Sequence, residues 1–395
     1  MNNLVKLSLM MFLQNMIFPV WFNTIIPYVE TVPGGDAFVP FCGALMGIGM
    51  FASPVVCMFA DRFLDSGKVL ALCNFLAAVT LGVASVVKDP VLLFALLVAS
   101  TICLMPTWSV VAAIAMAHAP TSSFPYIRAF GSVGWAASAV FSVVAIRWLG
   151  IADFDKSPYI LSTAAAVSLA ASLVALAMPP TPPKAKGERC SVADALGLGA
   201  LSLLKNRSFL FLSLLALLAM VPFQWYMAYN TKYLDEAGFK YLSLTQNLGQ
   251  VAELGFMLLL PVLFRRLSFR NVLLVGLSAL VFRYACFAIA VATGVHAFDF
   301  GGILVHGLIF GVLVVAFQMH AAEIAPPELR NQAQGFVMLL TAGIGTFVSV
   351  GVFNAILCHR PGVHDWPLAY MVALGISVLA LVLALFMKNE QNKSV

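Results

Sequence analysis

The feature that most limits the fold of this chain is a succession of apolar runs, each long enough to span a lipid bilayer. A helix needs about 20 apolar residues to cross roughly 30 Å of hydrocarbon. The composition agrees, because 62% of the 395 residues are hydrophobic, only 10% are charged, and the mean hydropathy is +0.97. Soluble globular proteins are far less apolar. The sequence therefore predicts an all-α membrane protein without a large soluble catalytic domain.

Charged residues and clusters of proline and glycine divide these runs into twelve expected transmembrane helices. The first run is too long for the apolar region of a signal peptide and lacks small cleavage-site residues, so we expect it to be retained. The predicted spans are 6–28, 38–60, 69–87, 91–117, 127–148, 158–178, 208–230, 242–264, 271–294, 301–322, 332–357 and 367–387.

One long polar connection, rich in proline and charge, lies midway along the chain. It predicts an N-terminal six-helix bundle over 1–178, a cytoplasmic linker over 179–207 and a C-terminal six-helix bundle over 208–395. Two related halves, with a binding site between them near the middle of the membrane, are typical of transporters.

The distribution of charge predicts the orientation and excludes several classes of function. Most of the 22 basic residues fall in loops on the side of the two termini, so the positive-inside rule predicts that both termini are cytoplasmic. The net charge of +5 is not gathered into a basic patch with aromatic residues, so we expect no nucleic-acid partner. The seven cysteines are scattered, which predicts neither disulfides nor a metal site, and no cofactor is expected.

Glu253 is the clearest functional candidate. It precedes Arg265, at the expected cytoplasmic end of its helix, by 12 residues and so lies roughly 18 Å deep. Gln250 shares its face. A carboxylate at this depth is costly unless it faces a cavity, so we expect it to bind cargo and a proton. The structural alternative is a Glu paired with an Arg that fastens two helices together.

A second polar face is expected on the helix over 127–148. Arg128, Ser132 and Trp135 are spaced i, i+4 and i+7, which aligns a cation, a hydroxyl and a large aromatic ring. This face suits a ligand with a ring and hydroxyl groups. Alternatively, Arg128 extends to the membrane interface and the neighbouring glycines serve helix packing. The residues leave both interpretations open.

Further candidates lie in the C-terminal half. His306 and Phe310 are spaced i and i+4, and the alternative for His306 is a packing role. Gln224 and Tyr226 follow Pro222, which is expected to loosen the helix beside a cavity wall or gate.

Three charged residues are assigned conformational or structural roles. We expect Asp61 and Arg62 to brace helices on the cytoplasmic side and Arg283 to anchor structure through a carboxylate or carbonyl groups. No nucleophile with a base, phosphate-binding loop or metal cluster is visible in the sequence, so we do not expect an enzyme.

Five segments, in order along most of the chain, resemble the nucleoside:proton symporter family of the major facilitator superfamily. The first runs from Leu7 to Gln14 with Trp21, and the second is Met105, Pro106 and Thr107. The third comprises Phe124, Pro125, Arg128, Gly131, Ser132, Gly134 and Trp135, and the fourth Gln250, Glu253, Pro261, Arg283 and Tyr284. The fifth comprises His306, Gly307, Pro327, Glu328, Leu329, Arg330, Ala333, Gln334 and Gly335.

The resemblance implies a major facilitator fold in the cytoplasmic (inner) membrane, alternating access, a monomer, and uptake of purine or pyrimidine nucleosides with protons. The cargo-site residues it implies are Arg128, Ser132, Trp135, Gln250, Glu253, His306 and Phe310. The family commonly places an Asp after the position of Phe310, where this chain has Gly311, and a Thr at Ser132. Glu253 is therefore the deep acid left for proton coupling.

Other functions remain as alternatives. A transporter of sugars, glycosides or other small polar solutes would use similar groups to recognise hydroxyls in the same fold, by symport or uniport. A membrane-embedded enzyme or a purely structural membrane protein is a further alternative. An enzyme needs a clustered catalytic set, and a structural protein has no need of Gln250, Glu253, Arg283 and His306 inside its spans.

Overall fold

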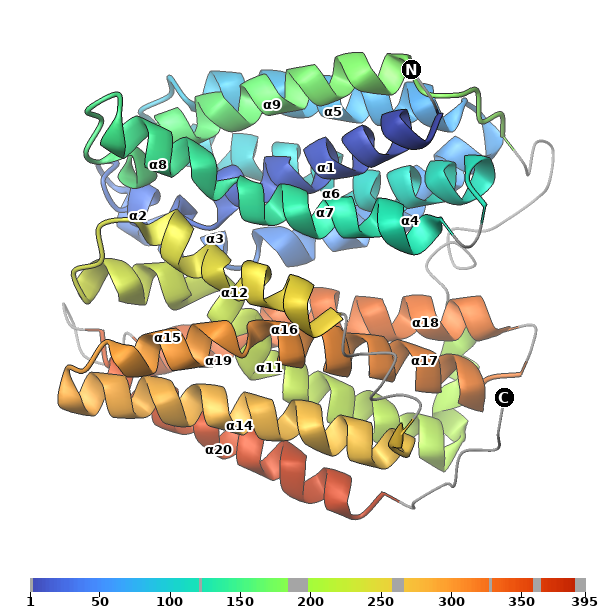
Figure 1. Ribbon diagram of the computed structural model, residues 1–395, viewed down its shortest axis with the longest axis vertical. Helices are drawn as coiled ribbons and strands as arrows, with labels where there is room; N and C mark the ends of the chain where they lie inside the picture. Colours follow the sequence, from blue (N-terminus) through green and yellow to red (C-terminus); the bar gives the residue numbers. More distant parts are fainter. Residues whose placement is uncertain are drawn as a thin grey trace. The chain divides into compact units, whose positions relative to one another are not determined.

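The computed structural model describes residues 3–120, 123–183, 198–257, 266–326, 329–357 and 364–387, and every regular element in these ranges is helical (Figure 1). The all-α prediction is confirmed. Of the sequence candidates, Asp61 lies in a helix, but its side chain is outside the described part of the structure.

The helices correspond closely to the predicted spans. In the described ranges, ten helices are long and apolar enough to cross a membrane, or eleven if the bent pair Gly35–Cys42 and Leu45–Met58 is one span. The two helices of this pair meet at 55° where a span over 38–60 was predicted. The predicted span over 242–264 is described only over Leu242–Met257. The count of twelve spans therefore stays a prediction.

Several helices begin where a side chain supplies a hydrogen-bond acceptor for the first turn. Asp89 accepts from the backbone N–H of Leu92 at 2.7 Å and is followed by a proline, which suits the first helical position. Asp365 accepts from Leu368 N at 3.0 Å in the same way. Both acids directly precede apolar runs, so the sequence itself marks where these two helices begin.

The chain separates into two compact units. Unit 1 comprises Met1–Ala195 and Ala228–Asn247, and unit 2 comprises Leu196–Met227 and Leu248–Val395. Two helices are divided between the units, α11 (Arg207–Glu236) and α12 (Leu242–Met257). Residues 184–197 of the predicted linker lie outside the described residues. The predicted boundaries at 178 and 208 stay a prediction.

Unit 1 is an array of helices that pack along their lengths. Figure 1 shows α1 beside α7, and α5 packs against both α6 and α9. Its elements are α1 (Asn3–Phe22), α2 (Ile25–Val29), η1 (Gly35–Phe38), α3 (Val39–Cys42), α4 (Leu45–Arg62), α5 (Ser66–Ala84), α6 (Pro90–His118), α7 (Phe124–Ala137), α8 (Ala139–Arg147), η2 (Phe154–Lys156) and α9 (Tyr159–Leu176).

Polar contacts explain why the segment 228–247 belongs to unit 1. The hydroxyl of Thr231 donates to the carbonyl of Asn23, and Lys232 donates to Glu30. Asn23 Nδ2 also donates to Asn247 Oδ1 at 3.0 Å. These buried bonds satisfy groups that would otherwise be costly among apolar helices.

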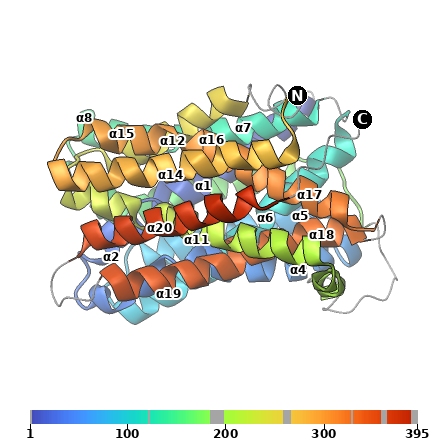
Figure 2. The same ribbon diagram turned by 90° about the horizontal axis from the view of Figure 1, so that it is seen from below.

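Unit 2 contains a long helix pair, α14 and α20, which lie side by side in both views (Figures 1 and 2). Two of its spans include a π-helical segment, a distortion often found at functional sites. The elements not yet given are η3 (Leu198–Lys205), α14 (Phe269–Thr293), α15 (Ala297–Leu304), α16 (His306–Ile309), π-helical η4 (Phe310–Val314), α17 (Val315–Ile324), α18 (Arg330–Met338), π-helical η6 (Leu339–Ile344), α19 (Gly345–Leu357) and α20 (Trp366–Leu385).

Candidate functional site

The predicted pair on α12 lies inside unit 2. The residue Glu253 is only 5% exposed, and Gln250, one turn earlier, is partly buried. Gln250 Nε2 lies 2.9 Å from His306 Nε2. Because an amide N–H₂ group donates, the ring nitrogen accepts, and the proton of a neutral His306 is then on Nδ1. The structure thus brings together two helices that sequence spacing treated separately.

Two glycines allow this close approach. A Cβ atom added at Gly307 would lie 2.2 Å from the Cα of Glu253, and one added at Gly249 would lie 2.9 Å from the Cβ of His306. Real Cβ atoms do not approach so closely, so any larger residue would force the helices apart. The backbone of α12 at Glu253 therefore rests directly on α16.

An aromatic stack continues from this contact. The rings of His306 and Phe310 are nearly parallel, with centroids 6.1 Å apart and an interplanar angle of 6°. Phe223 stacks on His306 at 5.5 Å and on Phe310 at 6.0 Å. Tyr226 lies 5.6 Å from His306. Phe223 is not among the site residues that the sequence predicted. Its position one residue after Pro222, on the same helix as Tyr226, is the signal that could have identified it.

Arg283, on α14, lies next to this stack and is completely buried. Its Nε donates to the carbonyl of Gly302 at 3.0 Å, and its guanidinium carbon lies 3.9 Å from the ring centroid of Tyr226. Its two terminal nitrogens have no hydrogen-bond partner among the described residues. A carbonyl and a cation–π contact therefore hold this cation. Its assignment as a structural anchor stays a prediction.

The predicted face on α7 belongs to unit 1. Ser132 is buried, Trp135 is half-buried and Arg128 is exposed. The Arg128 side chain lies along its own helix, since a Cβ at Gly131 would be 2.9 Å from Nη1 of Arg128. The same Cβ would be 2.8 Å from Nδ2 of Asn15 on α1. The cation is therefore directed toward α1 in this structure.

Trp135 is part of an aromatic cluster that the sequence did not predict. Its ring centroid lies 5.9 Å from that of Trp108 on α6 and 6.3 Å from that of Phe18 on α1. Trp108 directly follows Met105, Pro106 and Thr107, one of the segments that carry the family resemblance, so its position offered a signal. The ring of Trp135 on α7 is therefore packed against aromatic rings of α6 and α1.

The remaining candidates, on α11 and at the end of α4, have contacts of their own. Gln224 Nε2 donates to the carbonyl of Thr341 at 3.3 Å, and the hydroxyl of Tyr226 has no partner among the described residues. α11 continues through Pro222, whose carbonyl accepts from Tyr284. Arg62, the last residue of α4, is half-buried.

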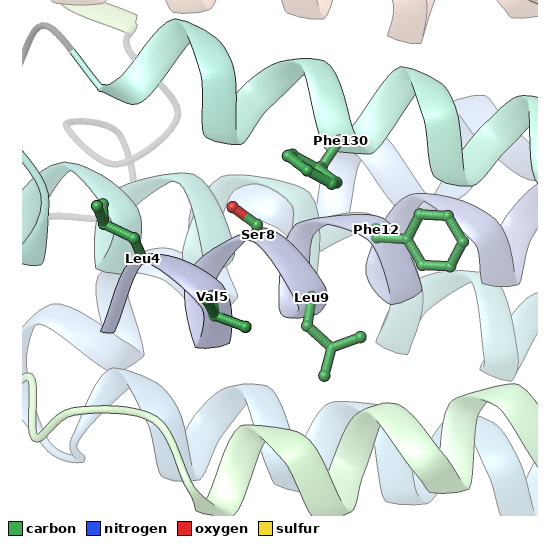
Figure 3. Close-up of a pocket in the computed structure, with 6 residues that line it drawn as sticks. All are labelled: Leu4, Val5, Ser8, Leu9, Phe12 and Phe130. Atoms are coloured by element: carbon green, nitrogen blue, oxygen red, sulfur yellow. The ribbon is translucent and has the colours of Figure 1, made fainter. Parts of the chain in front are cut away.

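One groove of about 370 Å³ lies between α1 and α7 within unit 1 (Figure 3). Its lining is apolar apart from one hydroxyl, so it suits lipid chains better than a polar ligand. The lining residues are Leu4, Val5, Ser8, Leu9, Phe12 and Phe130, and the predicted cargo residues are not among them. Within the described ranges, no group of three or more His, Cys, Asp or Glu is placed to hold a metal ion.

Comparisons with known proteins agree along the whole chain. The family described as nucleoside H+ symporter matches residues 1–392. YegT of Escherichia coli (strain K12), a candidate nucleoside transporter, is 30% identical over 100% of this chain and 96% of its own length. The xanthosine permease of the same organism is 27% identical, over 98% of this chain and 96% of its own.

The fold is also found in a solved structure. The crystal structure of the nucleoside transporter NupG superposes with a TM-score of 0.83 at 22% identity, covering 98% of this chain and 100% of that one. This similarity confirms the major facilitator fold. The family match shows that the chain is a multi-pass membrane transporter, not an enzyme. It belongs to the nucleoside H+ symporter family.

Proposed function

We propose that this transporter takes up nucleosides across the cytoplasmic membrane together with protons, by alternating access. The residues proposed to bind cargo are Arg128, Ser132, Trp135, Gln224, Tyr226, Gln250, Glu253, His306 and Phe310. A binding site near the membrane midplane, formed by two related halves, is the common arrangement of such carriers.

The observation that carries this proposal is the burial of Glu253 within a polar and aromatic cluster. Its side chain is 5% exposed, one helical turn from Gln250, and its backbone rests on Gly307. A purely apolar interface would not need an acid at this depth. Glu253 binds cargo when one side of the membrane is open and exchanges its proton with each side in turn.

The other residues have complementary roles. Trp135 and Phe310 hold the nucleobase, because aromatic stacking accepts any base. Gln250 and His306 offer hydrogen bonds to polar groups of the base or ribose, and they already bond to each other at 2.9 Å. Arg128 contributes a cation to the cargo site.

We further propose twelve transmembrane helices in two six-helix halves, with both termini cytoplasmic and a monomeric carrier. The ten apolar helices, the bent pair and α12 together supply the twelve spans. Lys and Arg in the loops on the side of the termini support this orientation.

Uptake into proteoliposomes tests the function. We expect vesicles with an alkaline interior to accumulate radiolabelled uridine or adenosine, and a protonophore to abolish the accumulation. Failure of both nucleosides to enter would contradict the proposal. Competition by free xylose or glucose, without competition by nucleosides, would instead favour the alternative of a sugar transporter in the same fold.

Replacement of Glu253 tests the coupling. Glu253→Gln keeps the shape and hydrogen bonding of the side chain but cannot release a proton. We expect accumulation against the gradient to be lost while exchange of labelled for unlabelled nucleoside continues. Glu323→Gln is the control, because the side chain of Glu323 is 73% exposed. A Glu253→Gln carrier that still concentrates nucleosides would refute the coupling role.

A further inference from the structure

A second buried acid lies far from Glu253 in the sequence and has no role in the proposed cargo site. Asp155 is in η2, between α8 and α9 and outside the membrane-spanning helices, yet it is only 3% exposed. Buried carboxyl groups outside a functional site are uncommon because removal of a charge from water is costly. The surroundings of Asp155 therefore need an explanation.

The two oxygens of this carboxyl group differ. Oδ2 accepts from the hydroxyl of Ser142 at 2.8 Å and from the backbone N–H of Ser243 at 3.3 Å. Oδ1 is buried and has no partner among the described residues. An ionised carboxylate is poorly stabilised when one of its buried oxygens accepts no hydrogen bond. A proton on Oδ1 removes the charge and leaves both hydrogen bonds to Oδ2 in place.

No cation compensates the charge of Asp155 in the described part of the chain. Lys156, the next residue, instead bonds Asp235 at 2.7 Å. η2 packs against α2, α8 and α9, and its side chains also bond Asp235 on α11 and Ser243 on α12. The titratable or charged groups of α2, α8 and α9 and their ends are Tyr28, Glu30, Arg147 and Tyr159, and Glu30 is bound by Lys232.

Burial is the main cause that raises the pKa of Asp155 from 3.8 to about 6, and the Asp235 carboxylate adds to it. The hydrogen bonds from Ser142 and from the backbone act in the opposite direction, because they favour the ionised form. The carboxyl group is therefore protonated below about pH 6 and ionised above it.

Asp155 accepts a hydrogen bond from the first turn of α12, the helix that carries Gln250 and Glu253. Ser243 is the second residue of α12, and Glu253 follows ten residues later, about 15 Å along the same helix. A negative charge at a helix N-terminus is stabilising, and a bond to an ionised acceptor is stronger than a bond to a neutral one. Loss of the charge on Asp155 therefore weakens its hydrogen bond from Ser243 N and its stabilisation of the first turn of α12.

Resting on the function proposed above, we propose that Asp155 is a second proton-binding site of this transporter and that its protonation loosens the first turn of α12. A proton from the outer solution binds Oδ1 and forms an O–H bond, and the carboxylate becomes a neutral acid. Ser142 and Ser243 then donate to Oδ2 as the carbonyl oxygen of a neutral acid. Deprotonation reverses each change without any other reactant.

The pH dependence of uptake tests the first part. For the unaltered carrier we expect the initial rate of uridine or adenosine uptake to change with external pH around a midpoint near 6. Asp155→Asn should remove this transition, whereas Asp153→Asn should keep it, since Asp153 is exposed two residues away. An Asp155→Asn carrier with the same midpoint as the unaltered protein would overturn the proposal.

Ser142→Ala provides a test that keeps the acid. Loss of this hydrogen bond destabilises the ionised carboxylate, so the midpoint should move to higher pH. A midpoint that stays or falls would contradict the assignment. Infrared difference spectra of the purified carrier without cargo should contain a carboxylic acid band that titrates near pH 6 and is absent in Asp155→Asn.

Hydrogen exchange tests the link to α12. In the unaltered protein, peptides that cover the first two turns of α12 should exchange faster at pH 5 than at pH 7.5, after correction for intrinsic rates. In Asp155→Asn the protection should be the same at both values. Equal protection in the unaltered protein would overturn the loosening. These readouts need no cargo, so a carrier that transports no nucleoside would refute the proposed function separately.

Discussion

The polar face of α7 in unit 1 and that of α12 in unit 2 are built in different ways. Both use glycine to bring a helix against its neighbour, since a Cβ at Gly134 would lie 2.1 Å from the carbonyl oxygen of Phe12, much as Gly307 contacts Glu253. On α12, however, the acid is buried at the helix contact itself. On α7, the cation is exposed and lies along the helix surface.

This difference separates a buried helix contact from an exposed helix surface. The backbone at Glu253 lies directly against Gly307, whereas the Arg128 side chain is exposed. A buried acid is suited to a proton-dependent step, and an exposed cation is suited to contact with cargo. Substitutions should therefore affect the α12 site through structure and the α7 site through cargo affinity.

The largest effect is expected from Gly307→Ala. The added methyl group would collide with the backbone of Glu253, and overpacking of this kind costs about 1–3 kcal/mol of stability. We expect a lower unfolding temperature in detergent and the loss of most transport. Gly255→Ala is the matched control, because a Cβ there meets no atom within 4 Å. Equal behaviour of the two variants would mean that the close helix contact is not needed.

A smaller effect, confined to cargo, is expected from Trp135→Ala. Stacking of a base on an aromatic side chain is worth about 1–3 kcal/mol, so the Kd for nucleoside should rise roughly tenfold. The measurement is equilibrium binding of labelled nucleoside to the purified carrier. Trp148→Ala removes a ring that is 75% exposed and should leave the Kd unchanged. A Trp135→Ala carrier with unaltered affinity would limit the ring to packing against Trp108 and Phe18.

The smallest effect is expected from Arg128→Gln. Because the side chain is exposed, stability should change by no more than about 0.5 kcal/mol. If Arg128 contacts cargo, the Kd should rise several-fold, and Arg128→Lys should recover only part of the loss, since lysine lacks the planar fork of donors. Arg147→Gln, at the exposed end of α8, serves as the control. Unchanged binding would favour the alternative that Arg128 only reaches the membrane interface.

Spacing along one helix predicted which candidate side chains share a face of that helix. The i, i+3 relation of Gln250 and Glu253 and the i, i+4 relation of His306 and Phe310 follow from helical geometry, and the latter rings are almost parallel. The contacts between helices were not predictable in this way. The contacts of Phe223 with His306 and of Trp108 with Trp135 depend on how separate helices pack.

Asp155 illustrates the same limit. In the sequence it is one of two acids in a short loop, and nothing distinguishes it from Asp153. Its burial and its bonds to Ser142 and Ser243 depend on residues 13 and 88 positions away. No local pattern encodes such contacts.

The sequence by itself determined the membrane class and most helix positions, because hydrophobicity and capping residues act locally. Tertiary structure alone decided which polar groups are buried together. It placed Gly307 against Glu253, gathered the aromatic stack, and directed Ser243 to the carboxyl group of Asp155. The physical reason is that burial and hydrogen bonding between helices depend on how whole helices pack, and many apolar sequences satisfy the bilayer equally well without specifying that packing.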